Sequence, residues 1–272
     1  MAEESSIAVL ESRAVVAVDG EDWRDFLQGL ITQDVDTLRP GEARFAALLT
    51  PQGRLLFDLF VIGREDGVWL DVEREGREAL IARLGLYRLR AKVRIAAEDA
   101  RVFAAWGDPP GAGWVADPRL PALGWRGYGL EVAPNASEAD YQAHRLALGI
   151  PGPADWGTEK TYPIEANFDL LNGIDFKKGC FVGQETTSRM KRRGQIKNRM
   201  APIAFEGPPP APGAEVLAGD LRAGEVLSGA DGRAMALLRL DRIEGAALTV
   251  EGRPAQVEFP EWFANEAAPV SS

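Results

Sequence analysis

The residues best suited to chemistry lie in one segment, 176–185, which contains Cys180, the only cysteine of the chain. Gly179 and Gly183 flank the thiol and allow a tight backbone or the close approach of a ligand. Gly183 precedes a stretch with helix-forming character that stops at Gly194, so Cys180 is expected just before a helix N-terminus. The helix dipole and the neighbouring lysines both favour the thiolate, which predicts a reactive or ligating thiol. The alternative is a small buried hydrophobic side chain, as most free cysteines are.

The charges around this cysteine differ from those of the rest of the chain. Residues 177–199 contain eight basic side chains and one acid, Glu185, whereas the whole chain of 272 residues has a net charge of −10. The remaining residues therefore carry −17. This balance excludes a protein that coats nucleic acid or an anionic membrane with its whole surface. The basic segment is either a solvated helix face or a site for an anion, such as a carboxylate-bearing cofactor, a phosphate or RNA.

The counts of cysteine and histidine exclude several kinds of site. A single cysteine rules out an intrachain disulfide, a multi-cysteine zinc site and an iron–sulfur cluster held wholly by cysteines of one chain. A single histidine, His144, rules out a His–His metal site and the HExxH motif. His144 is far in sequence from the cysteine and from carboxylate clusters, which favours a structural role. We therefore expect no metal site built by this chain alone.

The sequence also carries signals of location. The N-terminus is acidic and lacks the features of a secretory or transit peptide. No run of eighteen apolar residues occurs, so no membrane-spanning helix and no membrane partner are expected. A lone unpaired cysteine is typical of a reducing compartment. Together these features predict a cytoplasmic protein.

The organisation of the chain follows from its length and its turn residues. The length predicts one or two domains. Residues 7–18 form an apolar run that predicts a strand, and Asp19 can cap a helix after it, as Ser137 can cap a later one. Residues 207–213, rich in Pro and Gly, predict a stiff linker. Short strands separated by Gly-containing turns follow within 214–264 and predict a small antiparallel barrel.

The segment Lys178–Glu185, Lys-Gly-Cys-Phe-Val-Gly-Gln-Glu, closely resembles the KGCYxGQE signature of the YgfZ family. These are folate-binding proteins related to the aminomethyltransferase (T-protein) of glycine cleavage, and they act in iron–sulfur cluster assembly or repair. The segment departs from the signature at Phe181, where the family usually has tyrosine. The similarity covers roughly 7–260. Other matching segments, in the same order, are Phe26–Gly29, Thr32–Val35, Leu49–Arg54, Tyr87–Arg90, Gly149–Pro151 and Pro163–Ala166.

The resemblance implies an α+β fold with two folate-binding-type subdomains around a central cleft, followed by the small C-terminal antiparallel barrel. The two subdomains would occupy 1–206, interleaved, with the second near 96–150. The implied ligand is tetrahydrofolate or a derivative, and the implied partners are iron–sulfur client or assembly proteins. The implied catalytic residues are Cys180 and Lys178. The implied cofactor-binding residues are Glu131, in a segment similar to the pterin-binding segment of T-proteins, with Arg90, Gly179, Gly183, Gln184, Glu185 and Arg189.

Three functions are consistent with these observations. The first is a folate-binding protein that supports assembly or repair of iron–sulfur clusters through Cys180 and is not a conventional enzyme. The second is a folate-dependent aminomethyltransferase or demethylase, although residues 87–90 offer bases where T-proteins use an aspartate. The third is an RNA-binding module. It is disfavoured because no aromatic residues are interleaved with the bases, so nucleic acid is not expected as a partner.

Overall fold

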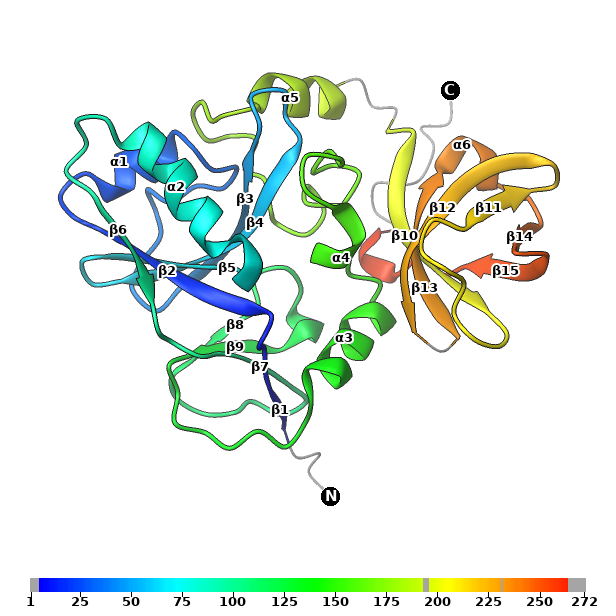
Figure 1. The fold of residues 1–272 in the computed structure, drawn as a ribbon, viewed down its shortest axis with the longest axis horizontal. Coiled ribbons are helices and arrows are strands. Elements are labelled where there is room, and N and C mark those ends of the chain that lie inside the picture. The colour runs from blue at the N-terminus through cyan, green and yellow to red at the C-terminus, as the bar shows by residue number, and fades with distance from the viewer. Residues whose placement is uncertain (1–4, 193–195, 231, 264–272) are drawn as a thin grey trace.

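The computed structural model describes residues 5–192, 196–230 and 232–263. They form two sheets covered by helices and a closed barrel at the C-terminal end (Figure 1). This arrangement confirms the predicted α+β fold with two subdomains and an antiparallel barrel. No helix within these described ranges is long and apolar enough to span a membrane.

The first subdomain is a five-stranded antiparallel sheet. In spatial order its strands are β3 (Ala43–Leu49), β4 (Leu55–Arg64), β5 (Gly67–Glu73), β2 (Arg13–Asp19) and β6 (Arg94–Glu98). Helices α1 (Trp23–Gln28) and α2 (Arg77–Arg88) pack on one face, where Leu27, Leu80 and Leu84 join the strand side chains in one core. The short 3-10 helix η1 (Arg74–Gly76) leads into α2.

The second subdomain is a four-stranded sheet that takes one strand from the start of the chain. Its order is β1 (Ser6–Val9), β7 (Val102–Trp106), β9 (Trp125–Tyr128) and β8 (Trp114–Ala116), with η2 (Pro121–Leu123) between β8 and β9. The predicted single strand over 7–18 is therefore wrong. A turn at residues 10–12 divides it, so that β1 and β2 enter different sheets and the subdomains interleave.

The barrel begins earlier than the sequence predicts. Its closed order is β10 (Asn198–Phe205), β13 (Arg233–Arg239), β12 (Leu221–Ala230), β11 (Glu215–Ala218), β14 (Leu248–Val250) and β15 (Arg253–Val257), with α6 (Leu240–Ile243) after β13. Residues 207–213 connect β10 to β11 and so lie within the barrel; they are not a linker before it. Five strands match the predicted segments, and β10 was missed because it precedes the Pro-rich turn.

Helix caps were predicted with mixed success. The Ser137 hydroxyl accepts a hydrogen bond from the Asp140 N–H and the Asp140 carboxylate accepts one from the Ser137 N–H, so Ser137 caps α3 (Glu138–Ala147) as expected. Asp19 is not a cap, because it ends β2 and its carboxylate pairs with Arg94 at 2.5 Å. Asp22 occupies the cap position of α1.

The barrel is tied to the rest of the chain through α4 (Pro153–Trp156). The Ser228 hydroxyl of β12 donates to the Asp155 carboxylate, which also pairs with Arg145 of α3. Figure 1 shows the barrel beside the two sheets, with α3 and α4 between them. The three parts therefore meet around α3 and α4.

Candidate functional site

Cys180 is exposed on the loop 176–183, directly before α5 (Gln184–Arg192). The Gln184 N–H donates to the Phe181 carbonyl at 3.2 Å and begins the turn into the helix. A Cβ atom built on Gly179 would meet nothing within 4 Å, so the chain beside the thiol is open to a visiting molecule. The position before a helix N-terminus is thus as predicted, and the alternative of a buried cysteine is wrong. Gly194, the predicted helix end, lies outside the described residues.

Lys178 fixes this loop to the end of α1. Its Nζ donates to the carbonyl oxygens of Gln28, Ile31 and Gln33 at 2.8, 2.7 and 2.9 Å. Burial lowers the pKa of Lys178 to about 8. All three N–H donors of the ammonium are therefore used to hold backbone. This geometry makes Lys178 a positioning residue, and the catalytic role expected for it stays a prediction.

A second anchor lies at the start of the loop. The Asp175 carboxylate accepts hydrogen bonds from the backbone N–H groups of Lys177 and Lys178 at 2.7 and 3.2 Å. The Asp175 N–H donates to the carbonyl of Thr32 at 2.9 Å. The Phe181 side chain is 6% exposed and packs into the core below the loop. The residue that replaces the family tyrosine is therefore part of the support of the loop.

Gly183 fits a place where another residue would collide with the β3–β4 turn. Its φ is +80°, and an added Cβ would lie 2.6 Å from the Thr50 oxygen and 2.9 Å from the Gly53 Cα. We expect Gly183→Ala to lower the free energy of unfolding by more than about 1 kcal/mol in urea titrations. Gly179→Ala is the matched control, because its Cβ would meet open space. Equal stability of the two variants would contradict this role for Gly183.

The basic segment presents less free charge than its sequence suggests. Arg199 is buried and pairs with Asp169 at 2.9 Å, and Lys191 approaches the same carboxylate at 3.4 Å. Glu185 and Arg189 are exposed on α5 and make no ion pair with any residue that the structure describes. The expected anion site is thus reduced to the bases at the surface of the loop and of α5.

Two of the expected cofactor-binding residues lie elsewhere. Arg90 is exposed just after α2, and Glu131 is exposed just after β9. In the described ranges, no hydrogen bond or ion pair joins either side chain to the loop 176–183. Their assignment to a folate site stays a prediction from the resemblance.

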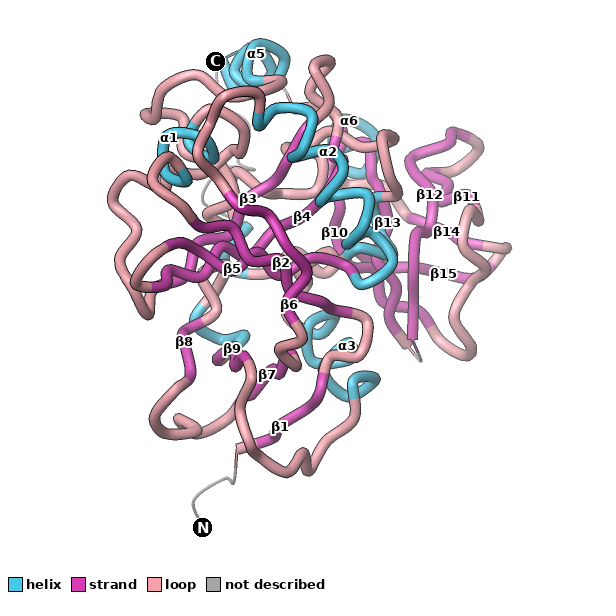
Figure 2. The backbone as a smooth tube through the Cα atoms, turned by 60° about the vertical axis from the view of Figure 1, so that its left-hand side comes forward, coloured by secondary structure: helices cyan, strands magenta, loops and turns pink. Residues whose placement is uncertain are grey.

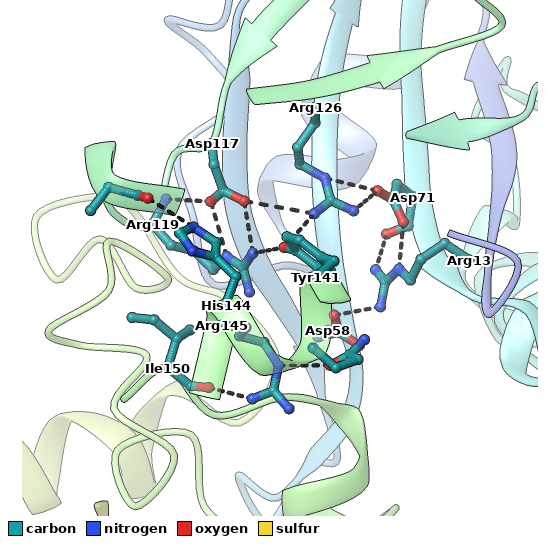
Figure 3. Close-up of polar contacts among 12 residues, drawn as sticks. Arg13, Asp58, Asp71, Asp117, Arg119, Arg126, Tyr141, His144, Arg145 and Ile150 are labelled. Carbon is teal, nitrogen blue, oxygen red and sulfur yellow. Dashed lines mark hydrogen bonds and ion pairs between the residues drawn. The ribbon is translucent and has the colours of Figure 1, made fainter. Parts of the chain in front are cut away.

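The two subdomains meet at a network of buried charges that the sequence analysis missed (Figure 3). Asp71 of β5 pairs with Arg13 of β2 at 2.6 Å and with Arg126 of β9 at 2.5 Å. Asp117 pairs with Arg119 at 2.7 Å and lies 3.7 Å from Arg126. Each of these side chains is at most 6% exposed. The network therefore joins the first sheet to the second through buried ion pairs.

These ion pairs predict that the folded protein loses stability in acid. Burial raises the pKa of Asp71, but Arg126 and Arg13 outweigh it and hold that pKa below its usual range. Such a carboxyl adds stability that is fully present above its unfolded pKa and is lost as the pH falls through the folded one. We expect thermal unfolding midpoints that are flat between about pH 5 and 7 and fall below about pH 4. A midpoint that stays level down to about pH 2 would contradict this expectation.

A pocket beside this network lies between the two subdomains. Phe60, Arg119, Arg126 and Tyr141 line it, and its volume is about 40 Å³. That is room for about three water molecules, since each needs roughly 10–15 Å³ in this measure. The guanidinium groups in its wall already pair with aspartates. The binding of a folate here stays a prediction from the resemblance.

His144 has the structural role that its sequence context favours. Its ring stacks on Trp106 with centroids 5.4 Å apart, and Nε2 lies 3.1 Å from the Ala122 carbonyl oxygen. Burial lowers the pKa of His144. The imidazole helps hold α3 against the second sheet.

Known proteins of similar fold support this geometry. Residues 197–265 match a family described as "CAF17, C-terminal beta-barrel domain". The solved aminomethyltransferase T of the glycine cleavage system from Bartonella henselae matches with a TM-score of 0.76 over 97% of this chain and 87% of that one. The sequence identity is 17%, so this likeness shows the fold alone. It confirms the predicted aminomethyltransferase-like architecture.

Curated relatives give the family. The human "Iron-sulfur cluster assembly factor IBA57, mitochondrial" is 31% identical over an alignment of 299 positions, gaps included, that covers 93% of this chain and 84% of the human protein. The chain belongs to the IBA57 family. The IBA57 homologue from Mycosarcoma maydis is 35% identical over an alignment of 238 positions, which covers 75% of this chain. This chain spans only 59% of that protein and 55% of the Neurospora crassa homologue.

The names of these IBA57 relatives correct one prediction. They are mitochondrial proteins, which contradicts the cytoplasmic location expected here. A lone cysteine indicates a reducing compartment and does not distinguish one such compartment from another. The expectation of an iron–sulfur cluster assembly family with an aminomethyltransferase-like fold is confirmed, and the family shown is IBA57; the YgfZ family itself stays a prediction from the resemblance.

Proposed function

We propose that this chain takes part in iron–sulfur cluster assembly, and that Cys180 binds one iron of a cluster shared with another protein. The names of the IBA57 relatives support the process. The observation that carries the chemistry is the exposed Cys180 thiol on a loop anchored from two sides. An exposed thiol on a fixed support is suited to meet a cluster that arrives on a partner.

The cluster must be shared because this chain cannot complete its ligand set. Clusters of this kind are held by four ligands, mostly cysteine thiolates. The chain has one cysteine, and among the residues that the structure describes no group of three or more His, Cys, Asp or Glu could hold a metal. The partner therefore supplies the remaining ligands, and the cluster is cargo that passes through the site.

The proposed step is a ligand exchange without change of oxidation state. The Cys180 thiolate forms a bond to one iron, and one partner thiolate leaves that iron. When Cys180 begins as the thiol, its proton ends on the displaced thiolate. The same exchange in reverse releases the cluster. Lys178 and Asp175 serve this step by holding the loop in place before the partner arrives.

Complementation tests this proposal. In cells that lack the native copy of this chain, Cys180→Ser is expected to abolish recovery of cluster-dependent enzyme activity. The matched variant adds Ala147→Cys to Cys180→Ser, which places an exposed thiol elsewhere and is expected to remain inactive. Folding of both variants is checked by thermal melts. Full recovery with Cys180→Ser would refute the role of the thiol.

Tetrahydrofolate has no step in this proposal, because the ligand exchange needs only thiolates and iron. Folate binding stays a prediction from the resemblance to the YgfZ family, and so does the aminomethyltransferase alternative that depends on it. A titration with tetrahydrofolate followed by tryptophan fluorescence tests it. Saturable binding that is weakened by Glu131→Ala would confirm the prediction, and a flat titration would refute it.

A further inference from the structure

The end of α2 exposes two leucine side chains that are not buried in any core of the fold. The helix buries Leu80 and Leu84 against the first sheet. Leu86 lies on the opposite side of the helix and is 70% exposed, and Leu89, just past the helix end, is 89% exposed. Leu221, on the barrel, is the other leucine among the described residues with large exposure, at 64%, and it stands alone. The end of α2 therefore presents two apolar side chains, three positions apart in the chain, to solvent.

The backbone at this end of the helix is strained at Leu89, the residue that ends α2. Leu89 has a φ of 39° and a ψ of −102°, where glycine or asparagine is better tolerated. A polar residue would also suit a side chain that is almost wholly in water. Both the conformation and the side chain are thus locally unfavourable, which points to a use outside the fold.

The end of α2 is also strongly basic. Residues 79–93 contain four basic side chains and no acid, in a chain of net charge −10. Lys92 is paired with Glu21 at 2.7 Å. Within the part of the chain that the structure covers, Arg83, Arg88 and Arg90 form no ion pair, and the last two are exposed. We call Leu86, Arg88, Leu89 and Arg90 the α2 patch.

The α2 patch lies at the same end of the molecule as the cysteine loop. The views in Figure 1 and Figure 2 agree that the end of α2, α1 and the segment leading into α5 gather there. Tyr87 of α2 and Val182 of the loop pack against the same core. Lys178 ties the loop to the end of α1, and Lys92 meets the start of α1 through Asp22. One partner can therefore contact both features.

We propose that the α2 patch is the docking surface for an acidic protein that has an apolar contact ringed by carboxylates and brings its own thiolates to Cys180. This inference rests on the proposed function. Charge complementarity selects the occupant. A second copy related by a twofold axis would place the same arginines against each other. A lipid surface supplies no thiolate to Cys180, so it does not fit the proposed function.

Site-directed crosslinking of the full chain tests the proposal. The photocrosslinker p-benzoylphenylalanine is placed at position 89 or, as a control, at position 221, in cells where this chain replaces the native copy. A bismaleimide reports the neighbour of Cys180. We expect position 89 and Cys180 to give the same acidic, cysteine-bearing protein, and position 221 not to give it. With that protein purified, Leu89→Glu is expected to weaken binding at least about tenfold. Arg88→Glu should weaken it most at low salt.

Each other outcome overturns the docking surface. A crosslink from position 89 to a second copy, to lipid or to a protein that is not acidic would do so, and so would unchanged binding by Leu89→Glu. The proposed function fails separately, when Cys180→Ser supports full cluster-enzyme activity. Activity lost with Cys180→Ser but kept with Leu89→Glu would refute the docking surface alone. Leu89 is exposed, so its variants are expected to keep the wild-type melting temperature.

Discussion

Replacing Asp71 by asparagine is expected to lower the free energy of unfolding by about 3–5 kcal/mol, because it leaves two buried guanidinium groups without their shared counter-charge. Asp71 joins Arg13 and Arg126, and the three side chains are at most 6% exposed. Arg13 keeps its pair with Asp58 at 2.8 Å. Among the described carboxylates, Arg126 keeps only Asp117, at 3.7 Å, and so bears most of the loss. The same change loosens the contact between the subdomains, since Arg126 belongs to the second sheet.

Thermal and urea unfolding measure this effect. A loss of this size corresponds to a fall of about 10 °C in the melting temperature. Asp66→Asn is the matched control, because Asp66 is exposed in the turn between β4 and β5 and the substitution removes the same charge. If both variants melted together, the buried network would contribute no more than a surface charge, and the account of the subdomain contact would be wrong.

Replacing Lys178 by methionine is expected to lower the free energy of unfolding by about 2–3 kcal/mol, since hydrogen bonds from a charged donor are among the stronger ones. The substitution leaves the carbonyls of Gln28, Ile31 and Gln33 without the Nζ donor that they share. It also frees the loop that carries Cys180. We expect faster modification of the thiol by iodoacetamide and lower efficiency in cluster assembly at the same protein concentration.

Lys177→Met is the control that separates the loss of the Lys178 hydrogen bonds from the loss of a positive charge. Lys177 is the neighbouring residue, its side chain is exposed, and it makes no hydrogen bond through Nζ in the described structure. Its substitution is expected to leave stability and thiol reactivity near wild type. Equal behaviour of the two lysine variants would show that the loop is held by something other than Lys178.

The sequence indicated the position of the thiol because the local signals agree there. Gly183, the helix-forming residues after it and the basic side chains all belong to one short segment, and the helix begins at Gln184 as that segment predicts. Five of the barrel strands could also be predicted from the sequence, because Gly-containing turns separate them. Short-range patterns of this kind are read directly from neighbouring residues.

The contacts that support the site could not be predicted from the sequence, because they join residues that are distant in the chain. Lys178 bonds to carbonyls about 150 positions earlier, a contact that no local pattern encodes. Asp71 and Arg126 meet across two sheets, and β1 crosses to the second sheet through a short turn that the apolar run 7–18 conceals. Asp175 offered one usable signal, since an aspartate two residues before a turn often accepts backbone N–H groups.

The α2 patch was not predicted from the sequence, although residues 87–90 match the family pattern. Arg90 alone among them was assigned to the ligand site; the structure exposes both Leu89 and Arg90. Helical periodicity explains Leu80 and Leu84, and it leaves Leu86 on the solvent side. Only the backbone angles at Leu89 show that the helix ends by turning that side chain outward.

Iron ligation by Cys180 is tested most directly by cluster uptake in solution. The full chain is mixed anaerobically with a glutathione-ligated [2Fe–2S] cluster, and the iron that stays with the protein is measured together with its visible circular dichroism. Glutathione thiolates stand in for the partner's ligands, so the account predicts a protein-bound cluster with wild type and none with Cys180→Ser or with Cys180→Ser carrying Ala147→Cys. A cluster bound equally by wild type and Cys180→Ser, or by none of the three, would contradict it.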